Sequence, residues 1–315
     1  MAPISDPTSL LSQARDGDRR ALAKLITLVE NKRAGHSAAL AQLYREGGQA
    51  WTTGLTGAPG AGKSTLTDGL IGTLRARDVE VAVLAVDPSS PFTGGAILGD
   101  RVRMADHIDD DGVYIRSMAS RGELGGISEA TPRALVVLDG AGFREILLET
   151  VGVGQAEVAV VGAADTTVVV VTPGWGDSVQ AAKAGLLEIG DVFVVNKADR
   201  SGVNDTMRDL KQMLELGGHG EWWPPVVPTV ATSGEGIDEL QHAIDDHRAY
   251  LESSGALAAR RRGHATSLLN DAVSVELRRE WARGRDQVAW ESLAAEVVSR
   301  RLDPWTAARR LVGSQ

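Results

Sequence analysis

The chain has 315 residues, 43% hydrophobic and 24% charged, which fits a folded protein with one large domain and appendages, or with two domains. A formal net charge of −9 argues against nucleic acid as the main partner, and the absence of cysteine excludes disulfides, thiolate metal sites and a thiol nucleophile. The N-terminus shows no signal-peptide pattern and the longest apolar runs are too short to span a membrane, so we expect a cytoplasmic protein without membrane contact.

Hydrophobic periodicity predicts an alternation of strands and helices along most of the chain. A helix-rich segment comes first, over residues 9–46. Strands are then predicted over residues 51–56, 79–86, 112–116, 145–149, 166–172, 191–196 and 225–231, and helices over 64–77, 131–140, 178–189, 204–216 and 237–252. This alternation is typical of an α/β fold, in which helices flank both faces of a mainly parallel sheet.

The character of the sequence changes after residues 253–255, and residues 256–311 are predicted to be helical with several arginine clusters. Two explanations stay open for this segment: a solvated face on amphipathic helices, or an arm that binds a partner or a second copy. We therefore expect an N-terminal helical extension (1–48), a central α/β domain (49–252) and a C-terminal helical arm (253–315). The apolar residues that could form the arm's contact stripe are Leu268, Leu269, Val273, Val275 and Leu277.

Residues 57–65 fit the phosphate-binding motif G-x-x-x-x-G-K-[ST] and lie between a predicted strand and a predicted helix. In that setting the glycines let the backbone N–H groups point at phosphates, and the helix N-terminus adds favourable partial charge. Lys63 is expected to reach the β- and γ-phosphates, and the Ser64 hydroxyl to ligate Mg²⁺. The predicted nucleotide-binding residues of this loop are Gly57, Ala58, Pro59, Gly60, Ala61, Gly62, Lys63, Ser64 and Thr65.

The sequence Asn196-Lys-Ala-Asp199 follows an apolar run and resembles the N-K-x-D element with which GTP-binding proteins recognise guanine. Asp199 can accept hydrogen bonds from N1–H and the exocyclic amine of guanine, a pair of donors that adenine lacks. Asn196 can donate to a ring acceptor or brace the phosphate loop, and the stem of Lys197 can lie across the base. A backbone contact to the base oxygen is further predicted for the loop residues Thr232, Ser233 and Gly234.

Further segments are predicted to respond to the γ-phosphate and the metal. Residues 149–152 resemble the D-x-x-G element with Glu in place of Asp, so that Gly152 can donate its N–H to the phosphate and Glu149 can order a metal-bound water. Gln155 is expected to position the attacking water, with a plain backbone contact as the alternative. The predicted metal-binding residues are Ser64, Asp87, Asp100 and Glu149, although Asp87 could instead cap a turn, and the predicted catalytic residues are Lys63, Glu149 and Gln155.

Seven blocks of sequence together resemble the GTPase chaperones of methylmalonyl-CoA mutase, the MeaB type, which are also called ArgK or LAO/AO transport system kinase-like proteins. The blocks lie at residues 57–65, 86–91, 94–104, 121–126, 149–157, 173–185 and 196–199. The resemblance implies a P-loop fold of the SIMIBI class of G proteins that binds GTP or GDP with Mg²⁺ and forms homodimers through the C-terminal arm. It also implies a metallochaperone that gates adenosylcobalamin loading into a B12-dependent acyl-CoA mutase and protects that enzyme.

In that family a further switch loop carries an Asp, a Gln and a Lys that couple the mutase to GTP hydrolysis. The matching positions here are Asp177, Gln180 and Lys183. The sequence departs from the common G-D-E-L-Q pattern, since it has Gly-Asp-Ser-Val-Gln at residues 176–180. The Asp and Gln are kept, so the coupling role is expected, while the choice of mutase stays open and Lys183 could be an ordinary surface lysine.

Other functions remain to be weighed against a GTP-hydrolysing switch. A kinase linked to lysine, arginine and ornithine transport is disfavoured by the guanine-binding element and by the lack of an export signal. A metal-insertion GTPase is disfavoured because there is no cysteine and the six histidines are scattered. A nucleotide-dependent scaffold, in which hydrolysis is incidental, would keep its partner when Lys63 is replaced.

Overall fold

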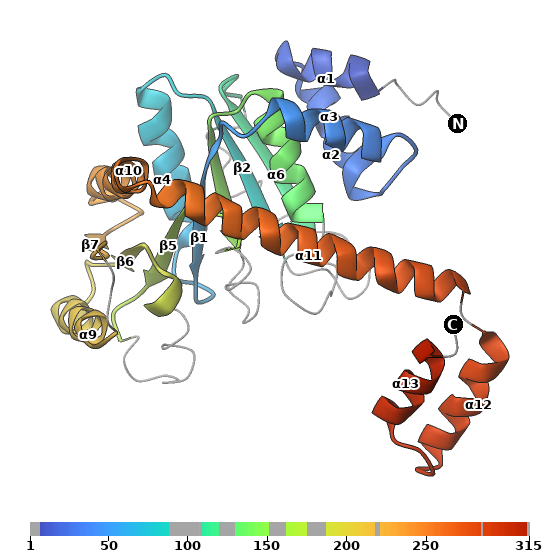
Figure 1. Ribbon diagram of the computed structural model, residues 1–315. Coiled ribbons are helices and arrows are strands. Elements are labelled where there is room, and N and C mark those ends of the chain that lie inside the picture. Colours follow the sequence, from blue (N-terminus) through green and yellow to red (C-terminus); the bar gives the residue numbers. More distant parts are fainter. Residues whose placement is uncertain are drawn as a thin grey trace. The chain divides into compact units, whose positions relative to one another are not determined.

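The predicted strands form one parallel sheet in the computed structural model of the chain (Figure 1). Seven strands lie in the order β3-β2-β4-β1-β5-β6-β7, and every neighbouring pair is parallel. The α/β class with a mainly parallel sheet is therefore confirmed. The strand bounds are β1 Trp51–Gly57, β2 Val81–Asp87, β3 Val113–Ala119, β4 Glu145–Thr150, β5 Thr166–Val171, β6 Val192–Asn196 and β7 Val226–Thr229.

The structure describes most of the chain, and it contains two compact units. The first unit ends at His264 and the second begins at Ala265. The division into three parts that composition predicts, with boundaries after residues 48 and 252, stays a prediction. The described residues are 7–87, 107, 109–119, 130–150, 162–174, 187–217, 221–284 and 286–313.

Strand β1 lies at the point where the strand order of the sheet reverses: β2, β3 and β4 lie on one side of it, and β5, β6 and β7 lie on the other. It pairs with β4 on one side and with β5 on the other. After β1 the chain forms β2, which lies on the far side of β4 from β1. After β4 it forms β5, which lies on the opposite side of β1. In an open parallel sheet, the loops at the carboxyl ends of the strands around such a point enclose the ligand-binding crevice. The segment that follows β1 is the predicted phosphate loop.

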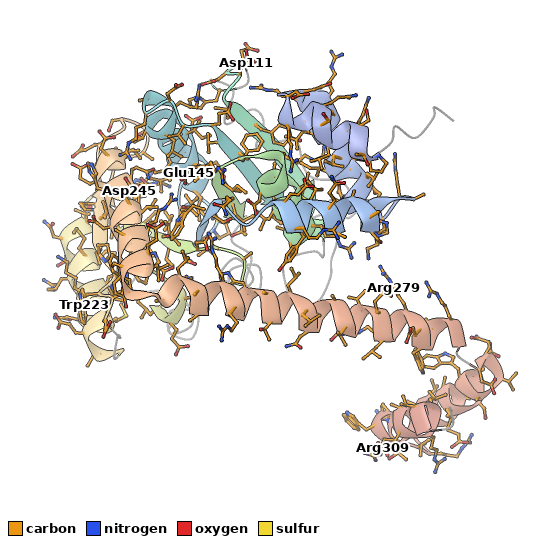
Figure 2. All side chains as sticks on the ribbon, turned by 45° about the horizontal axis from the view of Figure 1, so that its top comes forward. Asp111, Glu145, Trp223, Asp245, Arg279 and Arg309 are labelled. Atoms are coloured by element: carbon orange, nitrogen blue, oxygen red, sulfur yellow. The ribbon has the colours of Figure 1, made fainter. Side chains whose placement is uncertain are left out.

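Helices cover both faces of the sheet because successive residues of a buried parallel strand face opposite sides. Helices α4 (Lys63–Ala76) and α10 (Ile237–Ser254) pack on one face. An ion pair of 2.8 Å joins Arg77, just after α4, to Asp245 of α10. Figure 2 labels the side chain of Asp245. Helices α6 (Ala130–Ala141) and α9 (Val203–Leu216) pack on the opposite face. The core on the first face includes Leu55, Leu66, Val83, Val170 and Leu240, and the core on the second includes Leu84, Val137, Leu148, Phe193 and Leu210.

The N-terminal helices dock on the α/β core through α6. These helices are α1 (Pro7–Arg15), α2 (Arg19–Glu30) and α3 (His36–Glu46), and their buried leucines share one apolar cluster with α6 and strands β2 and β4. Arg15 donates to the carbonyl of Gly140 at 2.9 and 2.8 Å. The carboxylate of Asp139 accepts the N–H groups of residues 48–50, just before β1. The N-terminal helices and the residues just before β1 are thereby both bonded to α6.

Two strands end more than one residue away from the predicted end. Strand β3 continues to Ala119 because it pairs with β2 along its whole length. Strand β7 ends at Thr229 because Val230 turns away and donates its N–H to the carbonyl of Glu235 at 2.9 Å. The predicted helix over residues 178–189 lies mostly outside the described residues.

The amino edge of the sheet holds a network of ion pairs around β5 and β6. The Asp191 carboxylate, just before β6, accepts two bonds from Arg260, at 2.9 and 2.6 Å, and one from the N–H of Thr167 at 2.7 Å. His247 is 1% exposed, with Nε2 at 3.3 Å from Asp191 Oδ1. Arg261 pairs with Asp165, just before β5, at 2.9 Å. The start of helix α11 (Ala256–Gly284) is thus tied to the amino ends of two strands.

The predicted C-terminal helices are present. Helix α11 crosses the boundary between the two units, and it is followed by α12 (Gln287–Val298) and α13 (Pro304–Gly313). Within the second unit, Trp281 and Trp290 form an edge-to-face pair with ring centroids 5.4 Å apart. Among the described helices, none is long and apolar enough to cross a membrane.

Candidate functional site

The predicted phosphate loop joins β1 to α4 and takes a shape that only glycine allows. Gly57, Gly60 and Gly62 have φ angles of 134°, 74° and 94°, in the left-handed region that disfavours side chains. A Cβ on Gly57 would lie 2.1 Å from the carbonyl oxygen of Val170, and one on Gly62 would lie 2.2 Å from Nδ2 of Asn196. The loop backbone therefore lies so close to β5 and to the residue that ends β6 that no side chain fits at Gly57 or Gly62.

Lys63 begins α4 and extends back along the loop. Its ammonium donates to the carbonyls of Gly57 at 2.6 Å and Ala58 at 3.0 Å, and the residue is 6% exposed. The cation therefore lies at the N-terminus of a helix, where backbone N–H groups and the helix dipole also favour an anion. This arrangement suits the phosphates of a nucleotide.

Glu149 of β4 lies against the first turn of α4. The Ser64 hydroxyl donates to Glu149 Oε1 at 2.5 Å, and the Thr67 hydroxyl lies 3.3 Å from Glu149 Oε2. Glu149 is 5% exposed, and its partner in the parallel register is Leu55 of β1. The sheet register therefore brings an acidic side chain to the serine that ends the phosphate-binding motif.

The donor set at this junction fits a hard cation. A serine hydroxyl and a carboxylate supply only oxygen, the ligand type that Mg²⁺ prefers when phosphates and water complete its shell. No group of three or more His, Asp or Glu side chains that could hold a metal by itself occurs among the described residues. The backbone of Asp87 ends β2 at the same edge, but the Asp87 side chain and all of Asp100 lie outside the described atoms.

Asn196 braces the phosphate loop. Its Nδ2 donates to the carbonyl of Ala61 at 2.8 Å, while its Oδ1 accepts from the Thr229 hydroxyl and the Ala231 N–H, both at 3.1 Å. The residue is 2% exposed, so these bonds are shielded from water. The amide thereby links three segments: the phosphate loop, the end of β6 and the end of β7.

The rest of the predicted guanine-binding element lies next to this brace. Lys197 has a φ of 61°, and its ammonium donates to the Gly60 carbonyl at 2.7 Å. Asp199 is exposed, as are Thr232, Ser233 and Gly234 in the loop after β7. Because β6 and β7 are neighbours, the two loops leave the same edge of the sheet together. The loops that carry these exposed groups therefore leave the sheet next to Asn196 and Lys197, both of which are bonded to the phosphate loop.

Some predicted site residues have no described position. In the sequence they follow β2, β4 and β5, and all of them lie outside the described residues. These residues are Asp100, Gly152, Gln155, Asp177, Gln180 and Lys183.

Two hydroxyl residues at the site were missed by sequence reasoning. Thr67 follows Ser64 by three positions, so helical periodicity alone places both on one face of α4. Thr229 is the register partner of Asn196 across β6 and β7. The first could have been found from its spacing, whereas the second required the register of two predicted strands.

Most of the chain is similar to known proteins. Residues 22–285 match the family model described as "Methylmalonyl Co-A mutase-associated GTPase MeaB". The "Putative GTPase" of Pyrococcus horikoshii is 46% identical over 312 residues, which cover 98% of this chain and 97% of that protein. GTPase ArgK of Escherichia coli is 36% identical over 313 residues, which cover 96% and 94% of the two chains.

A solved structure of similar fold spans nearly the full length. It is described as "LAO/AO transport system kinase", and it superposes with a TM-score of 0.75 at 26% identity, covering 99% of this chain and 98% of the other. The similarity extends over the α/β core and the helices on either side of it in the sequence.

Proposed function

This chain belongs to the MeaB family of GTPases, and on that premise we propose that it works as a magnesium-dependent GTP switch for a B12-dependent acyl-CoA mutase. The reaction is GTP and water to GDP and phosphate. The observation that carries the proposal is the bond of 2.5 Å between the Ser64 hydroxyl and Glu149. It joins the phosphate loop to the first residue of the segment predicted to sense the γ-phosphate.

The chemistry follows from the groups at the carboxyl edge. Lys63 and the loop N–H groups would stabilise the charge that spreads over the phosphate oxygens during in-line attack. Ser64 and Glu149 would hold Mg²⁺, directly or through water, with Asp87 and Asp100 as further proposed ligands. The chemistry that Mg²⁺ supplies when bound is neutralisation of the β- and γ-phosphates. Gly152 would donate its N–H to the γ-phosphate, and Gln155 would orient the attacking water.

Guanine selection is proposed for the loops after β6 and β7. Asp199 would accept from N1–H and the exocyclic amine, and residues 232–234 would offer a backbone contact to the base oxygen. Asn196 and Lys197 support this role because both are bonded to the phosphate loop, at 2.8 and 2.7 Å. Base recognition and phosphate binding would then act on one connected piece of structure.

The partner is proposed from the family to which the chain belongs. The matching family model is described as mutase-associated, and Asp177, Gln180 and Lys183 are the residues proposed to pass the mutase's influence to the GTP site. In that role the protein would gate adenosylcobalamin loading and protect the mutase in the cytoplasm.

A homodimer is also proposed, formed through the C-terminal arm. Leu269, Val273 and Leu277 of α11 are 63%, 48% and 61% exposed and recur every four residues, so they form an apolar stripe along one side of that helix. A second copy of the arm would bury this stripe.

The test is GTP hydrolysis by the full chain, alone and with purified methylmalonyl-, isobutyryl- or ethylmalonyl-CoA mutase. We expect slow hydrolysis that depends on Mg²⁺ and is accelerated by one of these enzymes, with formation of a complex. Lack of both acceleration and complex with all of them would contradict the chaperone role and leave the GTPase assignment intact. A Lys63→Ala protein that still binds and protects the mutase would favour a scaffold in which hydrolysis is incidental.

A further inference from the structure

Thr67 is a fully buried residue of α4 for which the GTPase reaction as proposed above has no role. Its side-chain oxygen lies 3.3 Å from Glu149 Oε2 and 3.0 Å from the carbonyl oxygen of Lys63. Ser64 lies three residues earlier and bonds the other carboxylate oxygen at 2.5 Å. The two oxygens of Glu149 are thus held by two hydroxyls on successive turns of one helix.

A threonine hydroxyl has only one proton, so its two acceptors compete for it. The carboxylate is the stronger acceptor because hydrogen bonds to an ionised group are roughly twice as strong as neutral ones. The Lys63 carbonyl is a local alternative of the kind that threonine commonly uses within helices. Thr67 therefore retains a partner whichever way Glu149 turns, and it stabilises the orientation in which Glu149 faces α4.

That orientation decides what Ser64 can offer to a cation. Ser64 also has a single proton, and it is donated to Glu149. With its proton directed at Glu149, the serine oxygen can present lone pairs to a metal ion. If the carboxylate rotated away, the serine proton would be free to point toward the cation position and would weaken the ligand. Fixing the second oxygen of Glu149 therefore helps to keep Ser64 ready to bind a metal.

We propose that Thr67 is a positioning residue for the magnesium site: its hydroxyl holds Glu149 so that Glu149 in turn orients Ser64. The inference rests on the proposed magnesium-dependent binding of guanine nucleotide. Thr67 touches neither the nucleotide nor the metal, so its effect is transmitted through Glu149. Removing such a supporting partner typically weakens metal affinity by about 10–100-fold, and the bond of 3.3 Å suggests the lower end.

The experiment measures how firmly the full chain retains a fluorescent GDP analogue as free Mg²⁺ is varied. We expect Thr67→Val to raise the Mg²⁺ concentration for half-maximal retention by about tenfold. Thr67→Ser, which keeps the hydroxyl, should stay close to the unmodified protein. Thr73→Val removes a threonine hydroxyl from the same helix away from the site, where it lies 3.3 Å from Asp238, and should change nothing. GDP affinity without Mg²⁺ should be equal in all four proteins.

The outcomes separate this inference from the proposed function. If the unmodified protein retains GDP equally with and without Mg²⁺, the proposed magnesium-dependent nucleotide binding fails, and the inference that rests on it fails with it. If it depends on Mg²⁺ but Thr67→Val shows the same dependence, only the role of Thr67 is overturned. Equal weakening of GDP binding with and without Mg²⁺ would also overturn it, since that result indicates a packing defect. Thermal unfolding checks that Thr67→Val is folded, and Thr67→Ala takes its place if it is not.

Discussion

The two edges of the sheet hold their charged groups in different ways. At the amino edge, Asp165 and Asp191 are each paired with an arginine of α11 and with backbone N–H groups. At the carboxyl edge, the ammonium groups of Lys63 and Lys197 are bonded to carbonyls of the phosphate loop. Carboxylate–arginine pairs are stable partners, whereas a carbonyl is readily exchanged for a phosphate oxygen. We therefore expect the sheet to be anchored at its amino edge and to exchange its own contacts for a ligand at its carboxyl edge.

The largest expected effect comes from removing the cation at the exchangeable edge. Lys63→Ala should lower the rate of GTP hydrolysis by about 10²–10³-fold, because a preorganised donor to the developing phosphate charge is lost. Steady-state release of phosphate measures this effect. Lys211→Ala, on the exposed side of α9, is the control and should retain full activity. Hydrolysis that persists in Lys63→Ala would show that the phosphates are bound elsewhere.

The next effect tests the anchored edge. Arg260→Ala should lower the free energy of unfolding by about 2–3 kcal/mol, because Asp191 is left largely buried without its main cation. Urea unfolding measures this loss. Arg208→Ala breaks an exposed ion pair with Asp205 and should cost less than about 0.5 kcal/mol. If Arg260→Ala changed the affinity for GTP without lowering the free energy of unfolding, the amino edge would affect ligand binding and would not anchor the sheet, contrary to the proposal.

A smaller effect sharpens the assignment of the base site. Asp199→Asn should weaken GDP binding by about 10–100-fold, since each good paired contact to a base contributes about 1–3 kcal/mol. Inosine diphosphate lacks the exocyclic amine, so the unmodified protein should prefer GDP to it and the variant should lose that preference. Calorimetric titration with both nucleotides measures the ratio, with Asp209→Asn as control. An unchanged ratio in Asp199→Asn would place the base elsewhere.

The smallest effect is a pH dependence confined to the amino edge. Burial lowers the pKa of His247 from its ordinary value, while the nearby charge of Asp191 opposes this shift and that of Arg260 adds to it. The unfolded chain therefore binds the proton more readily, and stability should fall as the pH drops below the ordinary histidine pKa of about 6.5, by at most about 1.4 kcal/mol per pH unit. Urea unfolding between about pH 5 and 7 measures the slope.

His247→Gln is the matched variant for this pH effect, because the imidazole is removed while a polar side chain is kept. The free energy of unfolding of this variant should vary less with pH, because the contribution of His247 is removed. An equal slope in the variant and the unmodified protein would assign the pH dependence to other groups.

The sequence was sufficient to predict the strands of the sheet, the fold class and the family. All of the predicted strands are present in the described residues, and the expected family, α/β P-loop fold and GTPase class are confirmed. This success has a physical basis: buried parallel strands are continuous apolar runs, and a glycine loop between strand and helix has few other uses.

The contacts across elements could not be predicted in the same way. Thr67 meets Glu149 only because the register of β1 and β4 brings position 149 over the first turns of α4. Arg260 reaches Asp191 across 69 positions of sequence. Strand β7 is shorter than predicted because Val230 forms a local bridge with Glu235, a choice that β-propensity does not reveal.

One measurement tests the contrast between the two edges most directly: amide hydrogen exchange of the full chain with and without a non-hydrolysable GTP analogue and Mg²⁺. We expect slower exchange at residues 57–65 and 196–199, where phosphate and base replace the loop's own bonds, and no change at residues 165–167 and 191–192. An ATP analogue should leave the exchange at residues 57–65 and 196–199 unchanged. Slower exchange at the amino edge, or unchanged exchange in the phosphate loop, would show that the two edges do not differ in this way.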